Sequence, residues 1–192
     1  ASGDVMIEIG AVKIEDGVIT DRFDEFINPG FHIPDNITAL TEISDDMVSS
    51  ADTEENVTKR FLEWTGDLPM VAHNAKFDIS FIEMAMKKYN LGKFTNAVID
   101  TLELSRSLDR GFARHSLSAL VKRYNVPFDE ESHHRADYDA EGTALVFNKM
   151  ISKLENEKIY NVNELQNLVS KEELFKFGRT YHFNAIAKDR VG

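Results

Sequence analysis

Two short apolar runs, LPMVAH at residues 68–73 and NAVIDT at residues 96–101, each lead directly into a segment with helical periodicity. A strand that is followed by a helix and then by another strand normally forms a right-handed crossover with parallel strands. Two longer runs, VMIEIGAVKI and VITDRFDEFINP, are instead separated only by the turn signal EDG, which favours an antiparallel hairpin. The sequence therefore predicts an α/β domain with a mixed sheet, antiparallel on one side and parallel on the other.

Further helices are predicted from apolar residues that recur at helical spacing. They cover residues 53–65, the stretch HSLSALVKRYN, and a long segment that begins near Asp137. Short helical turns are expected near Thr38 and Asp45. The long helix has an apolar face formed by Ala140, Ala144, Phe147, Ile151 and Leu154.

Composition limits the class of partner. The chain has 192 residues, enough for one domain, and carries a net charge of −11 from 33 acidic and 22 basic residues. A protein that grips duplex DNA by its phosphates usually needs a basic face, so any contact with nucleic acid is expected to depend on cations held by carboxylates. It has no cysteine, which agrees with a reducing cytoplasm, and no apolar run long enough to span a membrane.

The stretch VAHNAKFDISF is the first that indicates chemistry. Its strand ends at His73 and Asn74, and Asp78 falls in the first turn of the next helix. Ligands of open α/β sheets bind at the carboxyl ends of the strands, so these side chains form a candidate site. The alternative is that Asp78 only complements the helix dipole. Asp100, at the end of the next strand, is expected to be structural and to accept hydrogen bonds from turn amides.

The second stretch that indicates chemistry is HHRADYDAEGTA. His134 precedes Asp139 by five residues, and the apolar face of the long helix begins one residue after Asp139. A carboxylate at the border of the core is costly unless it is paired, and a metal ion offsets that cost. His134 taken alone is equally consistent with an exposed loop histidine, and Asp137 with a helix N-cap.

Together the two stretches resemble the second and third motifs of the DnaQ-like 3′→5′ exonucleases, the DEDD group on an RNase H-like fold. Because residue 135 is Arg and residue 134 is His, the third motif is similar to that of the DEDDh subgroup. Other stretches resemble the proofreading domains of PolC-type DNA polymerase III. These are IEIGAVKI, IPDNITALTEISDDMV, VIDTLELSRSL and HSLSALVKRYNV.

The resemblance implies a reaction and a set of residues. Two Mg²⁺ or Mn²⁺ ions would be held by four carboxylates, of which Asp78 and Asp139 are two, and His134 would be the general base. The terminal nucleotide of a single-stranded DNA 3′ end would contact a second set of residues. These are His73, Asn74, Phe77, Leu40 and Thr41.

The first motif of the family, Asp-x-Glu on a central strand, has no match here, because Asp4 and Glu8 are four residues apart. The chain as given is therefore expected to be inactive, with its first motif upstream. A stable fold without that strand requires another segment, such as TYHFNAIA, or a neighbouring chain in its place. A smaller departure is Glu42, where the family usually carries Gly.

The resemblance also implies a domain plan and partners. Residues 1–155 would be the exonuclease domain. Residues 156–192 would be a connector into a truncated PHP-like domain, with TYHFNAIAKD as a lone strand. The partners would be the polymerase and PHP domains of the same parent polypeptide and other replisome components, in the cytoplasm. Two alternatives stay open: a non-catalytic remnant or scaffold of the replicase, and an RNA-directed 3′ exoribonuclease.

Overall fold

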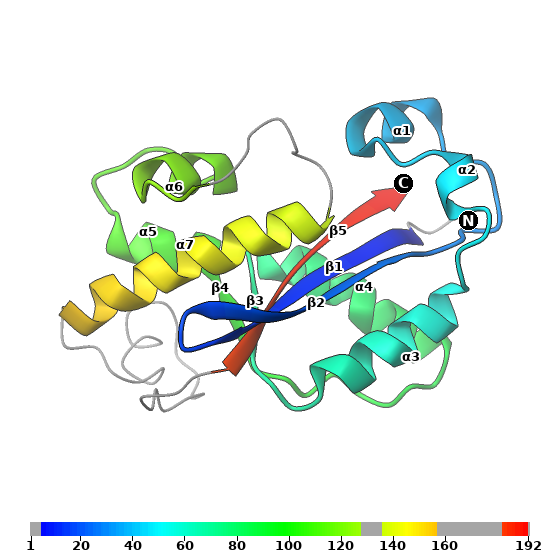
Figure 1. Cartoon of the computed structure of the whole chain (residues 1–192), viewed down its shortest axis with the longest axis horizontal. Coiled ribbons are helices and arrows are strands. Elements are labelled where there is room, and N and C mark those ends of the chain that lie inside the picture. Colours follow the sequence, from blue (N-terminus) through cyan, green and yellow to red (C-terminus); the bar gives the residue numbers. More distant parts are fainter. Residues whose placement is uncertain (1–4, 128–135, 157–181, 192) are drawn as a thin grey trace.

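A computed structural model describes residues 5–127, 136–156 and 182–191 of the chain. Five of its segments form one mixed sheet in the order β2-β1-β5-β3-β4 (Figure 1). The strands are β1 (Val5–Glu15), β2 (Val18–Phe26), β3 (Met70–Ala72), β4 (Val98–Asp100) and β5 (His182–Val191). The predicted mixed α/β class is confirmed.

β1 and β2 form the predicted antiparallel hairpin. The turn between them places Asp16 at φ 51° and Gly17 at φ 81°. Both angles lie in the left-handed region that Gly, Asn and Asp adopt most readily, so the EDG signal specifies this turn chemically.

β5 lies in the centre of the sheet. It pairs antiparallel with β1 along ten residue pairs and parallel with β3, where Ile186 opposes Ala72. The expectation of a lone strand is wrong, because β5 lies between the hairpin and the MVA strand. This is the slot that, by resemblance to the family, a strand with the first motif would fill. The expectation that the TYHFNAIA segment could take the place of a missing strand is confirmed for the described residues from His182 onward.

The helices cover both faces of the sheet (Figure 1). Their bounds are α1 (Asp35–Thr41), α2 (Asp45–Val48), α3 (Glu54–Thr65), α4 (Ala75–Lys88), α5 (Thr101–Leu108), α6 (Leu117–Arg123) and α7 (Ala136–Asn156). Every one of them begins within two residues of its predicted place or overlaps a predicted helical turn.

The core is divided by the sheet because alternate residues of a strand face opposite sides. Val12, Ile14 and Val71 pack with α5, α6 and α7 on one face, whereas Ala11, Met70 and Ala72 pack with α3 and α4 on the other. All five residues predicted for the apolar face of α7 are buried. A smaller cluster of Ile7, Ile33, Ile43 and Val48 holds α1 and α2 against β1.

Within the described ranges, no helix is long and apolar enough to cross a membrane.

Candidate active site

Asp78 lies in the first turn of α4, directly beyond the carboxyl end of β3. Its side chain is buried, with the residue 6% exposed. Asn74 precedes the helix in the left-handed conformation, at φ 66°, which turns the chain sharply from the strand into α4. The helix dipole stabilises a carboxylate in this first turn. The dipole thus offsets part of the cost of burying this acidic side chain.

His73 connects this turn to the next one. Its Nδ1 lies 3.0 Å from the hydroxyl of Thr101, and it also makes a hydrogen bond with the backbone of His115. Burial lowers the pKa of His73, against an opposing effect from the charge of Asp100. The ring is thus held neutral and oriented by its neighbours.

The structure confirms that Asp100 has the predicted structural role of accepting hydrogen bonds from turn amides. Its carboxylate accepts hydrogen bonds from the backbone amides of Asn74 and Ala75, both at 3.0 Å, and from Leu102 at 2.9 Å. It therefore caps α5 and braces the start of α4 at the same time. This arrangement sets the position of the turn that carries His73 and Asn74.

The first turn of α7 carries Asp137 and Asp139, and Asp139 is partly buried. This turn touches β1 at Gly10, where an added Cβ would lie 2.2 Å from the backbone nitrogen of Asp137. Only glycine permits so close an approach. His134 lies outside the described residues, so its predicted role stays a prediction.

Glu8 of β1 reaches the same turn. Its fully buried carboxylate accepts a hydrogen bond from the backbone amide of Ala136 at 2.9 Å. The predicted N-cap role of Asp137 is wrong, because Asp137 lies inside the helix and a residue 128 positions away binds the first amide. Local sequence reasoning missed Glu8, whose only signal was an acidic residue within an apolar strand.

Glu8, Asp24 and Asp137 each place one carboxylate oxygen within 4.8 Å of those of the other two. Asp24 is exposed, and Glu8 is bonded to the α7 amide. The positive end of the helix dipole offsets part of the charge of this group. We therefore assign the cluster to the attachment of α7 and not to the active site.

The remaining predicted substrate contacts fall on two helices. Leu40, near the end of α1, is 54% exposed. Thr41 is buried, and its hydroxyl donates to the carbonyl of Ile37 at 3.0 Å and accepts from the amide of Ile43 at 3.2 Å. Phe77 is partly buried in α4 and packs on Phe81, with ring centroids 5.5 Å apart. Leu40 and Asn74 are thus exposed, whereas Thr41 and Phe77 also serve packing.

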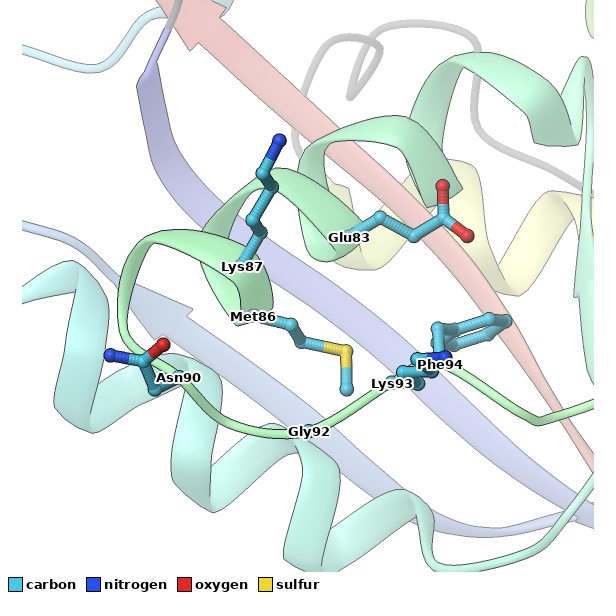
Figure 2. Close-up of a pocket in the computed structure, with 7 residues that line it drawn as sticks. All are labelled: Glu83, Met86, Lys87, Asn90, Gly92, Lys93 and Phe94. Carbon is cyan, nitrogen blue, oxygen red and sulfur yellow. The ribbon is translucent and has the colours of Figure 1, made fainter.

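A cavity of ≈ 670 Å³ lies at the opposite, C-terminal end of α4 (Figure 2). Met86 and Phe94 line it, together with the charged side chains of Glu83, Lys87 and Lys93. It is formed by the last turns of α4 and the loop that follows, whereas Asp78 lies in the first turn. The cavity therefore does not belong to the candidate active site.

The fold brings together the two helices that carry the predicted metal ligands. α4 and α7 both contact β5 and β3, from opposite faces of the sheet. Asp78 and Asp139 lie in the first turns of these helices. α1 also contacts β5, and Figure 1 shows it beside the carboxyl end of that strand.

Sequence and structural comparisons define the class of protein. A family model described as Exonuclease (RNase_T) matches residues 1–147. The chain belongs to this exonuclease family. DNA polymerase III PolC-type from Staphylococcus aureus is 41% identical over 189 residues, which are 98% of this chain and 13% of that relative. The chain thus spans only a small part of the length of the curated relatives it matches.

Solved structures agree with this assignment. Exonuclease X in complex with 5′ overhanging duplex DNA is 26% identical, with a TM-score of 0.65 over 85% of this chain and 90% of that one. The nuclease domain of 3′hExo, a DEDDh family member bound to rAMP, shares the fold at 17% identity, with a TM-score of 0.61 over 74% and 80%. These neighbours confirm the predicted RNase H-like fold class, and the second shows that a DEDDh family member shares this fold.

Proposed function

We propose that this domain removes nucleoside monophosphates from the 3′ end of single-stranded or frayed DNA, and that this is the proofreading activity of a bacterial replicative DNA polymerase III. One observation carries the proposal: Asp78 and Asp139 begin two helices that pack on the same central strands. The sequence similarity to PolC-type DNA polymerase III along 98% of the chain supports the biological setting.

The donor set fits a hard divalent cation. Carboxylate oxygens are the ligands that Mg²⁺ and Mn²⁺ prefer, and Mg²⁺ commonly takes one or two carboxylates together with substrate phosphate. Asp78 and Asp139 supply two such carboxylates at the starts of their helices. When bound, the metal ions would lower the pKa of a water molecule and stabilise the leaving 3′ oxygen.

Other side chains of the protein would transfer the proton and bind the substrate. His134 would take the proton of the attacking water as a base near neutral pH. Asn74 and Leu40, which are both exposed, would contact the terminal nucleotide. Phe77 would support them from α4, while His73 and Thr41, whose polar groups already have protein partners, would position their neighbours.

A second pair of carboxylates is needed to hold two ions. Glu8 is not a free ligand, because it is bonded to the first amide of α7. We infer that the Asp-x-Glu pair of the family completes the site. The 192-residue chain by itself would therefore be far less active than a form extended at its N-terminus by the residues that precede it in the parent polypeptide.

We further propose that in the parent polypeptide residues 1–155 belong to the exonuclease domain and residues 156–192 lead toward a PHP domain, with the Asp-x-Glu strand in the place that β5 takes in this chain. The polymerase domain and other replisome proteins would hold the duplex, in the cytoplasm. The acidic character of the chain suits this division, because the exonuclease domain itself handles only a few unpaired nucleotides.

The experiment compares how the 192-residue chain and the N-terminally extended chain cut a 5′-labelled DNA oligonucleotide in the presence of Mg²⁺ or Mn²⁺. The extended chain should give a ladder that shortens from the 3′ side, and chelation should stop it. Asp78→Asn and Asp139→Asn should abolish cutting and weaken metal binding in calorimetry, and His134→Ala should slow it by about 10²–10⁴. Asp67→Asn, a change at an exposed acid, is the matched control.

Three results would redirect the proposal. Metal-independent cutting, or release from the 5′ end, would refute it. Folded protein that binds a DNA 3′ end without cutting in either form would favour a scaffold role. Faster trimming of an RNA strand of the same sequence would favour the exoribonuclease alternative.

A further inference from the structure

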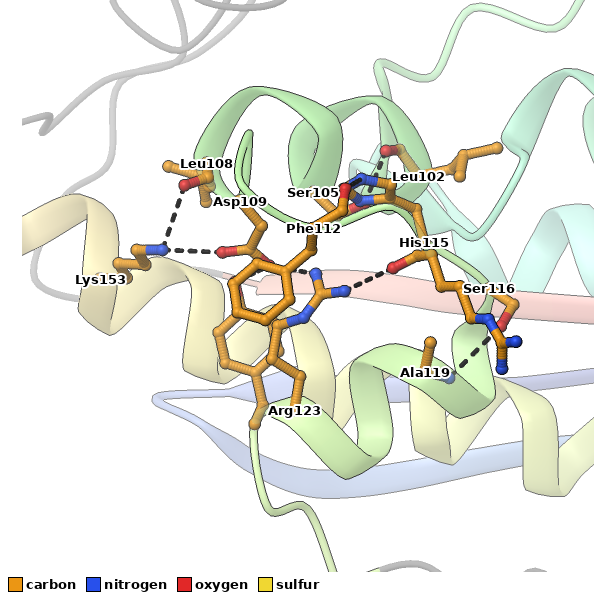
Figure 3. A network of polar contacts seen from close by, with 12 residues as sticks. Leu102, Ser105, Leu108, Asp109, Phe112, His115, Ser116, Ala119, Arg123 and Lys153 are labelled. Carbon is orange, nitrogen blue, oxygen red and sulfur yellow. Dashed lines mark hydrogen bonds and ion pairs between the residues drawn. The ribbon is translucent and has the colours of Figure 1, made fainter.

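The loop between α5 and α6 is held in a defined shape by its own polar contacts (Figure 3). The ring of His115 makes two hydrogen bonds of 2.9 Å, one with the hydroxyl of Ser105 and one with the carbonyl of Phe112. The backbone amide of Phe112 also donates to the carbonyl of Asp109 at 3.0 Å. Arg123 donates to the carbonyl of Arg114. These bonds restrict the loop at both ends.

This rigid loop holds an aromatic ring out in solvent. Phe112 is 56% exposed, although burial stabilises an aromatic side chain of this size. The guanidinium carbon of Arg123 lies 4.0 Å from the ring centroid, in a cation–π contact. Arg123 is in turn fixed by the buried carboxylate of Asp109 at 2.6 Å. The ring is thus supported on one side and open to solvent elsewhere.

Two further arginines lie close to Phe112 in the chain. Arg110 and Arg114, on either side of Phe112 in the chain, are both exposed. In the described part of the protein neither of them makes an ion pair, and the side chain of Arg110 donates only to the carbonyl of Ser107. In a protein with a net charge of −11, two such arginines beside an exposed ring form a local basic patch.

The loop is also joined to the candidate active site. His73, at the carboxyl end of β3, makes a hydrogen bond with the backbone of His115. At its other end, Asp109 accepts from Lys153 of α7 at 2.8 Å. Lys153 lies fourteen residues beyond Asp139, which is about 21 Å along the helix. The loop therefore extends from the site to a distance of several nucleotides.

We propose that Phe112, Arg110 and Arg114 form a stacking platform for single-stranded DNA, several nucleotides inward from the 3′ end that the active site holds. Every base has an aromatic face, so stacking on Phe112 would accept any sequence, as proofreading requires. The two guanidinium groups would contact the adjoining phosphates. The proposal rests on the proposed function for its choice of ligand.

The test is binding of 5′-fluorescein-labelled dT3, dT6 and dT12 to the 192-residue chain, measured by anisotropy in EDTA so that no cutting occurs. Phe112→Ala should weaken dT12 binding by about 5- to 150-fold, the usual effect of one stacked base. It should leave dT3 unchanged, because dT3 bound at the active site is too short to extend along the loop to Phe112. Phe112→Tyr should restore tight binding. Met84→Ala, another exposed apolar side chain at 50% exposure, is the matched control.

The roles of Arg110 and Arg114 are tested separately, through the salt dependence of DNA binding. Removing two phosphate contacts should reduce the slope of log K against log salt by about 1.4. Arg110→Gln with Arg114→Gln should do this, whereas Lys59→Gln with Lys87→Gln, which removes the same charge from α3 and α4, should not. In addition, a photoreactive base placed along dT12 should crosslink to the Phe112 peptide only at interior positions.

The outcomes separate this proposal from the exonuclease function. Unchanged dT12 affinity in folded Phe112→Ala, or no dT12 binding by the unmodified chain, would overturn the platform even if the extended enzyme trims DNA. Phe112-dependent binding of dT12 in a protein that never cuts would instead retain the platform and overturn the proposed reaction.

Discussion

The carboxylate of Glu8 accepts a hydrogen bond from the backbone amide of Ala136 at 2.9 Å, and it thereby attaches the start of α7 to β1. The two residues are 128 positions apart in the chain. Because Asp139 lies in the same first turn, this bond also sets the position of a proposed metal ligand. The attachment of α7 therefore positions a proposed metal ligand, although Glu8 itself is not assigned to the active site.

We expect Glu8→Ala to lower the free energy of unfolding by about 1–3 kcal/mol, since it leaves the buried amide of Ala136 without its acceptor. Glu8→Gln should lose less, because the amide oxygen can still accept. Urea unfolding measures both values. Glu63→Ala, at an exposed position of α3, should be neutral. Equal stability of Glu8→Ala and Glu63→Ala would show that the hydrogen bond contributes nothing.

Gly10→Ala tests the contact between β1 and α7 directly. The added Cβ would lie 2.2 Å from the nitrogen of Asp137 and 2.3 Å from the carbonyl carbon of Ala136, and both are backbone atoms that cannot rotate away. The helix must shift, at a cost of about 1–3 kcal/mol. Gly111→Ala, which meets no atom within 4 Å, is the control. Thermal melting that ranks the two variants equally would contradict the close approach.

Glu42→Gly should stabilise the protein. Glu42 ends α1 at φ 60°, in the left-handed region, which costs a non-glycine residue about 1–2 kcal/mol. Glycine relieves this cost but adds entropy to the unfolded chain, so we expect a net gain of about 0.5–1 kcal/mol. Glu63→Gly, within α3, should instead destabilise by about 1 kcal/mol. A loss of stability in Glu42→Gly would refute the assigned conformation.

Asp109→Asn should be among the most damaging single changes. Asp109 is buried, and it accepts from Arg123 at 2.6 Å, Lys153 at 2.8 Å and Tyr124 at 3.1 Å. Removing its charge leaves Arg123, whose side chain is 13% exposed, without its partner, and breaking such a buried pair costs about 3–5 kcal/mol. Denaturant unfolding at neutral pH measures the loss. A cost below that of Asp67→Asn would refute it.

The same carboxylate predicts a pH dependence. Burial raises the pKa of Asp109, but the hydrogen bonds from Lys153, Arg123 and Tyr124 and the charge of Lys153 outweigh it, so the pKa of this carboxyl lies below its usual range in the folded protein. Because the folded pKa is depressed, the stabilisation is complete above the unfolded value and is lost as pH falls through the folded value. Below pH 4, the free energy of unfolding should therefore fall more steeply with decreasing pH in the unmodified chain than in Asp109→Asn.

The central position of β5 can be tested through its backbone. Ile186 opposes Ala11 of β1 and Ala72 of β3, so its peptide group lies between two strands. Ile186→Pro removes a donor from the middle of the sheet and should cost about 3 kcal/mol or more. Hydrogen exchange should show β1 amides opening faster in this variant. An unchanged melting temperature would place the strand elsewhere.

Much of the local structure follows from the sequence itself. Strand and helix periods depend on neighbouring residues, and so the hairpin, the two short parallel strands and the apolar face of α7 were all predictable. The cap that Asp100 forms on the amide of Leu102 was predictable for the same reason, because the two residues are only two positions apart in the chain, whereas its bonds to Asn74 and Ala75 depend on the tertiary fold. The motifs around Asp78 and Asp139 were likewise predictable, because each is a short contiguous stretch of sequence.

Tertiary structure alone decided what distant segments do to each other. No local signal places residues 182–191 between β1 and β3, because strand order depends on which buried edges remain unpaired once the rest has folded. Glu8 could be interpreted only when the amide of Ala136 lay beside it, and Phe112 only when Arg123 and Asp109 fixed it in solvent. Sequence periodicity records which face of an element is buried, whereas its partner is selected by packing across the whole fold.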